Sequence, residues 1–177
     1  TIDEFVELSK EVKEKTGLRT NIGYNHETLP EYWLRAKGQV FFEEGKLGAK
    51  SADDISTIFD LEEQAVKEGW HVDPSVFTEI TVGSAEQDPM VYGSNEDSMS
   101  WCTFAYSNQL SSIQQAAPEG VEIGITTWPS DDLEKSNYLK PSQFFAVTAD
   151  CKNPEEAVKV LDYITNSVEC NEVLLGE

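Results

Sequence analysis

The chain has few of the residues on which most metal sites and enzyme sites depend. Its 177 residues include only two histidines and three cysteines. His26 and His71 lie far apart in the sequence, and neither has a neighbour at a metal-ligand spacing. No G-x-S-x-G, phosphate-binding-loop or G-x-G-x-x-G pattern occurs. The sequence therefore indicates no metal, no cofactor and no recognisable catalytic centre, so binding is favoured over catalysis.

The cysteines are too few for a disulfide framework and lack the spacing of a zinc site. Cys151 and Cys170 lie at the two ends of a predicted helix of about 13 residues, which spans about 20 Å at 1.5 Å per residue. A disulfide requires Cα atoms within about 7 Å of each other, so this pair is disfavoured. We expect Cys102, Cys151 and Cys170 to be reduced and mostly buried.

Basic residues are also scarce. The chain has 13 Lys and Arg against 33 Asp and Glu, a formal net charge of −20. A charge of that sign repels phosphate backbones and anionic membrane surfaces, which argues against nucleic acid as a partner. No apolar run approaches the ~20 residues that cross a bilayer, and no signal peptide is visible. Because Thr1 is not a natural start and Glu177 ends the chain abruptly, we expect a piece of a longer protein.

Helical and strand-like patterns alternate along the chain, which predicts an α/β class. The predicted helices cover 2–15, 31–40, 52–68, 110–117 and 154–167; the predicted strands cover 18–24, 99–104, 121–128 and 143–148, with a hairpin at 41–48. Residues 70–77 are predicted to be a connection. Thr1 and Glu4 have the spacing of a capping box, and Gly17 follows as a stop. Ser51 and Asn153 are placed as helix N-caps.

Residues 96–109 combine an apolar, strand-like run with a polar end. Met99, Trp101 and Thr103 alternate, and the run then leads into Tyr106-Ser107-Asn108-Gln109. In open α/β sheets, ligands bind where a strand ends at the surface ahead of a helix. Aromatic rings stack on the C–H faces of sugars, and amide side chains pair with hydroxyls. The alternative is a buried strand end followed by an ordinary turn.

A series of short motifs extends over nearly the whole chain. Thr1-Ile2-Asp3-Glu4-Phe5 opens the first helix, and an aromatic helix, a Gly-containing hairpin and a long helix ending at Gly69 follow. Asp97-Ser98-Met99, Tyr106-Ser107-Asn108-Gln109, Trp128-Pro129, 138–143, 152–157 and 171–177 come next. This order resembles the extracellular solute-binding proteins (family 1) of carbohydrate ABC importers, the class that includes maltose-binding protein. Two departures are Glu96-Asp97-Ser98, where the family usually has small residues, and Tyr106, where relatives often carry Trp.

The resemblance implies a type II periplasmic-binding-protein-like fold, in which a mixed sheet is flanked by helices. Residues 1–120 would form the second (C-terminal) ligand-binding lobe, 121–129 a hinge-crossing strand, and 130–177 a segment that completes the first lobe. It also implies a carbohydrate ligand, such as an oligosaccharide, that is held between two lobes and delivered to membrane permease subunits. The expected location is extracellular, as a lipoprotein or a periplasmic protein whose anchor and signal lie outside this chain.

Six residues are candidates for contact with the ligand: Asn25, His26, Trp33, Tyr106, Asn108 and Trp128. Asn25 and His26 follow the first predicted strand, where they either bind a hydroxyl or form an ordinary turn. Trp33 faces either the cleft or the core, and Trp128 either packs at the hinge or meets the ligand. Trp101 is predicted to lie in the core.

Without the rest of the first lobe, residues 130–177 would expose apolar surface and an unpaired strand edge. We therefore expect this tail either to pack on the remaining lobe or to exchange with a second copy in a domain-swapped dimer. Two other functions stay open: a fragment of a sugar-active hydrolase, and a non-catalytic protein-interaction domain.

Overall fold

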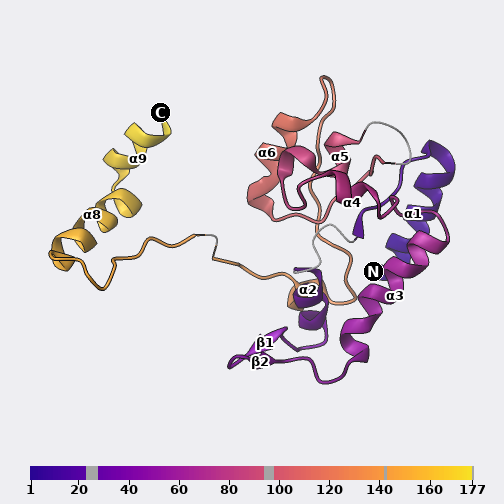
Figure 1. The fold of residues 1–177 in the computed structure, drawn as a ribbon, viewed down its shortest axis with the longest axis horizontal. Helices are drawn as coiled ribbons and strands as arrows, with labels where there is room; N and C mark the ends of the chain where they lie inside the picture. The colour runs from indigo at the N-terminus through magenta and orange to yellow at the C-terminus, as the bar shows by residue number, and fades with distance from the viewer. Residues whose placement is uncertain (23–27, 94–97, 142, 177) are drawn as a thin grey trace. The chain divides into compact units, whose positions relative to one another are not determined.

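The computed structural model describes residues 1–22, 28–93, 98–141 and 143–176. The chain divides into two compact units, Thr1–Tyr138 and Leu139–Glu177. Helices predominate, with 51% of the described residues helical. The elements of the first unit are α1 (Ile2–Thr16), α2 (Leu29–Ala36), β1 (Phe42–Glu43), β2 (Lys46–Leu47), α3 (Asp53–Lys67), α4 (Val76–Glu79), η2 (Ala85–Gln87), α5 (Pro89–Tyr92), η3 (Ser107–Gln109), α6 (Leu110–Ala116) and α7 (Leu133–Ser136). Those of the second are α8 (Pro154–Asn166) and α9 (Val168–Leu175) (Figure 1).

The two long helices of the first unit begin and end as their sequences predict. At α1, Thr1 Oγ1 accepts the Glu4 N–H at 3.2 Å, and the Glu4 carboxylate accepts from the Thr1 amino group at 2.8 Å. Gly17 closes this helix in the left-handed region, at φ 80°. At α3, the N-cap position is Ala52 and not the predicted Ser51, but Ser51 Oγ accepts the Asp54 N–H at 3.3 Å; Gly69 has φ 76° after the helix. The capping box and both glycine stops are therefore confirmed.

The sequence of 52–68 predicts an apolar stripe of Ile55, Ile58, Phe59, Ala65 and Val66, and the buried face of α3 differs from it in part. Ile58 and Ala65 are buried as expected, but Phe59 is 52% exposed and Val66 is exposed as well. Leu61 is buried in their place. Because residues three and four apart share a helix face, Ile58, Leu61 and Ala65 form one continuous row.

Three extended segments lie side by side and make isolated parallel bridges. The Thr20 N–H donates to Trp70 O and the Val72 N–H to Thr20 O, each at 2.9 Å. On the other side, the Trp101 N–H donates to Arg19 O at 2.9 Å. The prediction of a mere connection at residues 70–77 is thus wrong for 70–72, which pair with the first extended segment. Over their described residues, the predicted strands 18–24 and 99–104 contribute isolated bridges at Arg19, Thr20 and Ser100.

The predicted mixed sheet is not present among the described residues. The sheet that they contain is the antiparallel pair β1–β2, in which Phe42 pairs with Leu47 and Glu43 with Lys46. The predicted hairpin at 41–48 is confirmed, with Glu44 and Gly45 in its turn, and both residues have positive φ. The fold is α-rich, and the expected α/β class holds only in a loose sense.

Strands were also predicted at 121–128 and 143–148, and both predictions are wrong over the described residues. The first segment is extended, but a side chain takes the place of a neighbouring strand. Gln114 Nε2 donates to Val121 O, and the Ile123 N–H donates to Gln114 Oε1, both at 2.8 Å. An alternation of apolar and polar residues favours an extended backbone, but it does not supply the neighbouring strand with which a β-ladder must be formed.

The core of the first unit is built around α2, α3 and the paired segments. Its buried members are Ile22, Leu29, Tyr32, Trp33, Ile58, Leu61, Ala65, Trp70 and Phe104. Phe5, Cys102, Trp128 and Tyr138 are among the partly buried side chains that pack against this cluster. Residues from both ends of the unit therefore meet in one core.

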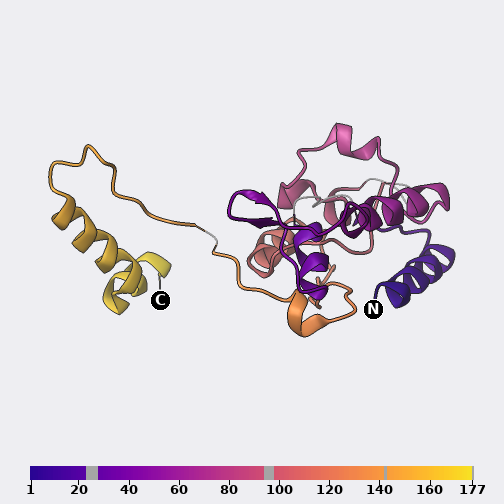
Figure 2. The ribbon, with the colours of Figure 1, turned by 90° about the horizontal axis from the view of Figure 1, so that it is seen from below.

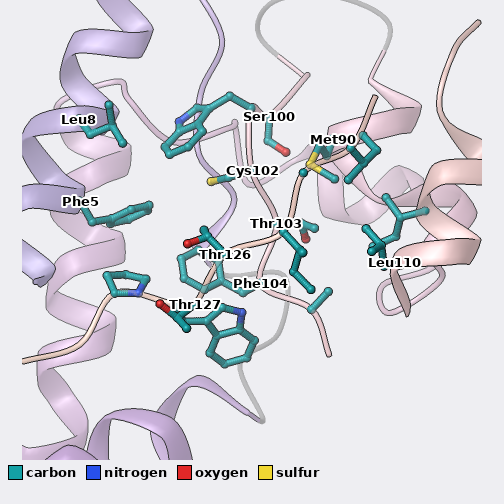
Figure 3. A pocket seen from close by; sticks show the side chains of 18 of the residues that line it. Phe5, Leu8, Met90, Ser100, Cys102, Thr103, Phe104, Leu110, Thr126 and Thr127 are labelled. Carbon is teal, nitrogen blue, oxygen red and sulfur yellow. The ribbon is translucent and has the colours of Figure 1, made fainter. Parts of the chain in front are cut away.

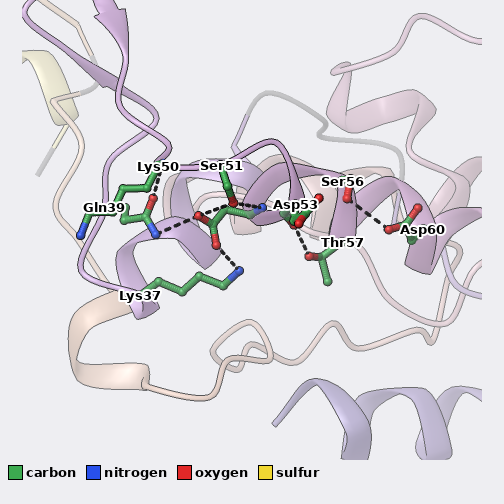
Figure 4. A network of polar contacts seen from close by, with 9 residues as sticks. Lys37, Gln39, Lys50, Ser51, Asp53, Ser56, Thr57 and Asp60 are labelled. Carbon is green, nitrogen blue, oxygen red and sulfur yellow. Dashed lines mark hydrogen bonds and ion pairs between the residues drawn. The ribbon is translucent and has the colours of Figure 1, made fainter.

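A polar network joins the end of α2 to the start of α3 (Figure 4). Asp54 accepts from Lys37 Nζ at 2.9 Å, from Gln39 Nε2 at 3.2 Å and from Ser51 Oγ at 3.0 Å. These hydrogen bonds lower the pKa of Asp54 to about 2, with that from Lys37 contributing most. The β1–β2 hairpin lies between the joined ends in sequence, and Figures 1 and 2 both show it beside α2.

The second unit contains an extended segment followed by α8 and α9. Asn153 and Pro154 stand at the N-cap and first position of α8 as predicted, although the Asn153 side chain makes no capping hydrogen bond. Ser167 Oγ accepts the Cys170 N–H at 3.2 Å and so caps α9. Apolar side chains are exposed on the extended segment, with Phe144 82% and Phe145 66% exposed. The assignment of 1–120, 121–129 and 130–177 to lobes and hinge stays a prediction.

All three cysteines carry free thiols. Each residue is of intermediate exposure, and burial of the Cys102 thiol is pronounced, so the expectation of mostly buried thiols holds for Cys102 and only in part for Cys151 and Cys170. Across the described ranges, no group of three or more His, Cys, Asp and Glu side chains could hold a metal ion. Nor is any helix in those ranges long and apolar enough to cross a membrane.

Candidate functional site

A cavity of about 730 Å³ lies within the first unit. Its walls come from α1, from residues 99–106 and from the extended segment 121–130 (Figure 3). In Figure 3, Phe5 and Leu8 extend from α1 on one side, and Met90 and Leu110 lie on the other. The volume falls within the range of about 300–1,000 Å³ that small-molecule sites occupy.

Aromatic rings form a connected series along this cavity. The Phe5 ring lies 6.0 Å from that of Trp101 and 5.6 Å from that of Phe104, centroid to centroid. Phe104 meets Trp128 edge to face at 5.5 Å, and Trp128 in turn meets Tyr32 at 5.2 Å. Edge-to-face pairs at these distances are favourable beyond the area that they bury. Four chain segments thus contribute to one aromatic cluster.

The backbone of Trp128 and Pro129 is held in place by α2. Tyr32 Oη donates to Trp128 O at 3.0 Å, and Trp33 Nε1 donates to Pro129 O at 2.8 Å. Burial raises the pKa of the Tyr32 hydroxyl, so it remains a donor at neutral pH. These two bonds fix the position from which the Trp128 ring reaches the cavity.

A buried carboxylate supports the wall from behind. Asp88 is 1% exposed and accepts from Thr103 Oγ1 at 2.5 Å, from Asn21 Nδ2 at 3.3 Å and from the Met90 N–H at 2.9 Å. Burial raises the pKa of Asp88, and these hydrogen bonds oppose that effect. Because Met90 and Thr103 both line the cavity, Asp88 couples two parts of its wall.

Two polar atoms at the wall have no hydrogen-bond partner within the described part of the chain. They are Ser100 Oγ and Trp101 Nε1, both buried, and both residues line the cavity. Cys102 follows them along the same segment, and burial is the main cause that raises the pKa of its thiol well above the ordinary range. A thiol that stays protonated is a poor nucleophile, so Cys102 serves as an apolar wall residue.

The structure brings together two of the predicted contact residues. Tyr106 and Trp128 both line the cavity. Trp33 is 5% exposed and lies in the core, where its indole N–H is bonded to Pro129 O. Asn108 is exposed in η3 and is not a lining residue. Asn25 and His26 lie outside the described residues.

Several lining residues were not expected from the sequence. The helical spacing places Phe5 on one apolar face of the first helix and does not indicate a cavity, and Trp101 is predicted to lie in the core. Nothing in the sequence singles out Ser100, because the burial of its hydroxyl cannot be inferred from a lone serine in an apolar run. A Ser-Trp pair within a strand-like run is the one pattern that could have suggested polar atoms at an apolar wall.

No family model matches the chain, and no solved structure matches it either.

Proposed function

We propose that the first unit is a solute-binding lobe that holds a carbohydrate against aromatic side chains, as the binding component of an ABC importer with a type II binding-protein fold. The observation that carries the proposal is the aromatic lining of the cavity by Trp101, Phe104, Tyr106 and Trp128. Sugars present C–H faces that pack on such rings, while their hydroxyls need nearby donors and acceptors.

The order of motifs along the chain supports the importer assignment independently of the cavity. In such a protein a second lobe would close over the solute and add contacts, so affinity depends on closure as well as on this lobe. The closed form would then dock on membrane permease subunits outside the cell. No residue is assigned a catalytic role: of the two acidic residues that line the cavity in the described ranges, Glu4 and Glu122, the first is ion-paired with the Thr1 amino group at 2.8 Å.

Binding without turnover tests this proposal. The 177-residue chain is titrated with glucose, maltose and maltotriose by isothermal calorimetry, and the same mixtures are analysed for hydrolysis by chromatography. Binding with no cleavage supports the solute-binding function, and cleavage would point to the hydrolase. Trp128→Ala should weaken binding by about tenfold or more, because an aromatic ring that stacks on a ligand contributes on the order of 1.5 kcal/mol.

Exposed apolar residues in the second unit also suggest a binding site for a protein partner. Leu139, Phe144 and Phe145 are exposed at 100%, 82% and 66%. Since exposed apolar residues in one short segment mark interaction sites, we propose that another protein chain covers them, with exchange of this tail between two copies as one arrangement. Light scattering after size exclusion measures the mass, and a monomer at all concentrations would contradict a dimer formed by the chain alone.

A further inference from the structure

Residues 124–127 form an exposed, extended edge in the first unit. The segment is held at both ends. On one side the Ile123 N–H donates to Gln114 Oε1 at 2.8 Å, and on the other Trp128 O accepts from Tyr32 Oη at 3.0 Å. Between these points, no backbone N–H or C=O of 124–127 makes a hydrogen bond within the described part of the chain. An exposed extended segment with unpaired backbone groups is a template on which another strand pairs.

Gly124, within this edge, has no reason to be glycine in the described chain itself. Its φ does not lie in the left-handed region, and a Cβ added to it would meet no atom within 4 Å. Glycine inside an extended segment often marks a place where a ligand or another backbone approaches closely. Because Gly124 also lines the cavity, the space beside it is open to such an approach.

A strand added to this edge would lie against the cavity. All four residues of 124–127 line it, and Figure 3 shows Thr126 and Thr127 around the same space as Phe5 and Phe104. Successive side chains of a strand point to opposite faces, so one face of the added strand would be directed at the cavity. In this mode of recognition, main-chain hydrogen bonds give affinity and pockets for alternate side chains give specificity. The aromatic walls therefore call for a strand with apolar alternate residues.

The second unit contains a segment with these properties. Residues 143–147 are extended and make no backbone hydrogen bond within the described part of the chain. Phe144 and Phe145 are 82% and 66% exposed. Because alternate residues share a face, Phe145 lies on one face with Val147, and Phe144 lies on the other with Ala146. The face of Phe145 and Val147 carries two large apolar side chains, whereas the opposite face carries one.

Charge also favours this segment as the occupant. The charged side chains that line the cavity in the described ranges are Glu4 and Glu122, both acidic. The chain has a formal charge of −20, yet 139–149 contains Lys140 and no acidic residue. An acidic peptide would be repelled by the two glutamates, whereas this part of the tail is not. A second copy of the chain thus supplies a strand that fits the edge in backbone conformation, apolarity and charge.

We infer that 143–147 of one copy pairs as a β-strand with 124–127 of a second copy and inserts Phe145 into the aromatic cavity. Phe144 then points away from the cavity. This inference rests on the exchange of tails proposed above and names the surface that receives the tail. Because the same cavity is proposed to hold the carbohydrate, the tail and the solute exclude each other.

Sedimentation velocity of the 177-residue chain over a range of concentrations tests this pairing. Phe145→Ser should raise the dimer dissociation constant about tenfold or more, because a buried phenylalanine is lost from each contact. Phe144→Ser is the matched control and should change it less than about twofold. On the receiving side, Gly124→Trp should block docking without loss of folded structure by circular dichroism, since the space at its Cβ is open. Ile125→Glu is a second receiving-side variant, on a side chain that is 63% exposed.

Mixing two defective variants gives the sharpest result. Phe145→Ser keeps an intact edge and Gly124→Trp keeps an intact tail, so an equimolar mixture should form a heterodimer through one contact although each variant alone is largely monomeric. A dimer that Phe144→Ser and Phe145→Ser weaken alike, or a mixture that stays monomeric, overturns this docking site and leaves an exchange of tails through another surface. A wild-type chain that is monomeric at every concentration overturns both. The carbohydrate proposal is independent of these results, because no sugar is present.

Discussion

Replacing Asp88 should expose how much the buried hydrogen-bond network behind the cavity stabilises the first unit. The carboxylate accepts from Thr103 Oγ1, Asn21 Nδ2 and the Met90 N–H, and it is 1% exposed. Asp88→Ala leaves these three donors without that acceptor. A buried group left unpaired costs about 1–3 kcal/mol. The Ala variant also removes a desolvated carboxyl group whose burial is unfavourable, which offsets part of the loss.

The expected net cost of Asp88→Ala is about 3 kcal/mol, since the losses within one network are not additive. Asp88→Asn is the matched variant, because the amide keeps one oxygen for the donors and can donate to Thr103 Oγ1. Its cost should be about 1 kcal/mol, the net value of a typical hydrogen bond. Urea unfolding followed by tryptophan fluorescence measures both, with equal m-values as the check that a common unfolding transition is compared.

The pH dependence of the folding stability is a second test of the Asp88 network. Burial raises the folded-state pKa of Asp88 above its ordinary value of 3.8. The folded protein therefore binds this proton more tightly than the unfolded chain, and the associated stability is fully present below pH 3.8 and lost as pH rises through the folded-state pKa. Wild type should consequently gain stability relative to Asp88→Asn as pH falls from 7 towards 4. A gain by the Asn variant instead, or equal costs for Ala and Asn, would refute this account of the network.

Three further perturbations test other contacts. Trp33→Phe removes the hydrogen bond to Pro129 O and should lower the free energy of unfolding in urea by about 1–2 kcal/mol. A loss of stability smaller than that caused by Trp128→Phe would show that the bond is dispensable. Asp54→Asn should lower the melting temperature at pH 7, where the wild-type carboxylate is ionised. The difference in melting temperature between wild type and variant should shrink as the pH falls through about 2, the folded-state pKa of Asp54. A difference that stays constant with pH would contradict the ion-pair explanation. Cys102 should resist iodoacetamide at pH 8 in the folded chain because burial raises the pKa of its thiol, and mass spectrometry of rapid modification at that residue would disprove it.

Local chemistry in the sequence determined where the helices begin and end. The Thr1–Glu4 capping box, Gly17 and Gly69 act through bonds and backbone angles within a few residues of themselves, so they can be predicted without a partner. The hairpin at 41–48 likewise follows from a local signal, because Gly45 readily adopts the positive φ of the turn, although Glu44 has φ 49° without that freedom.

Tertiary structure decided what the extended segments and the tryptophans do. Residues 70–72 pair with Thr20 although their sequence indicates only a connection, while 121–128 has a strand pattern and no strand to join. Trp33 and Trp128 are equally ambiguous in the sequence. One is bonded to Pro129 O in the core and the other lines the cavity, because α2 holds the backbone that positions the second ring. The Ser100 hydroxyl is buried without a hydrogen-bond partner in the described part of the chain, and that burial depends on the segments packed around it and not on the residue itself.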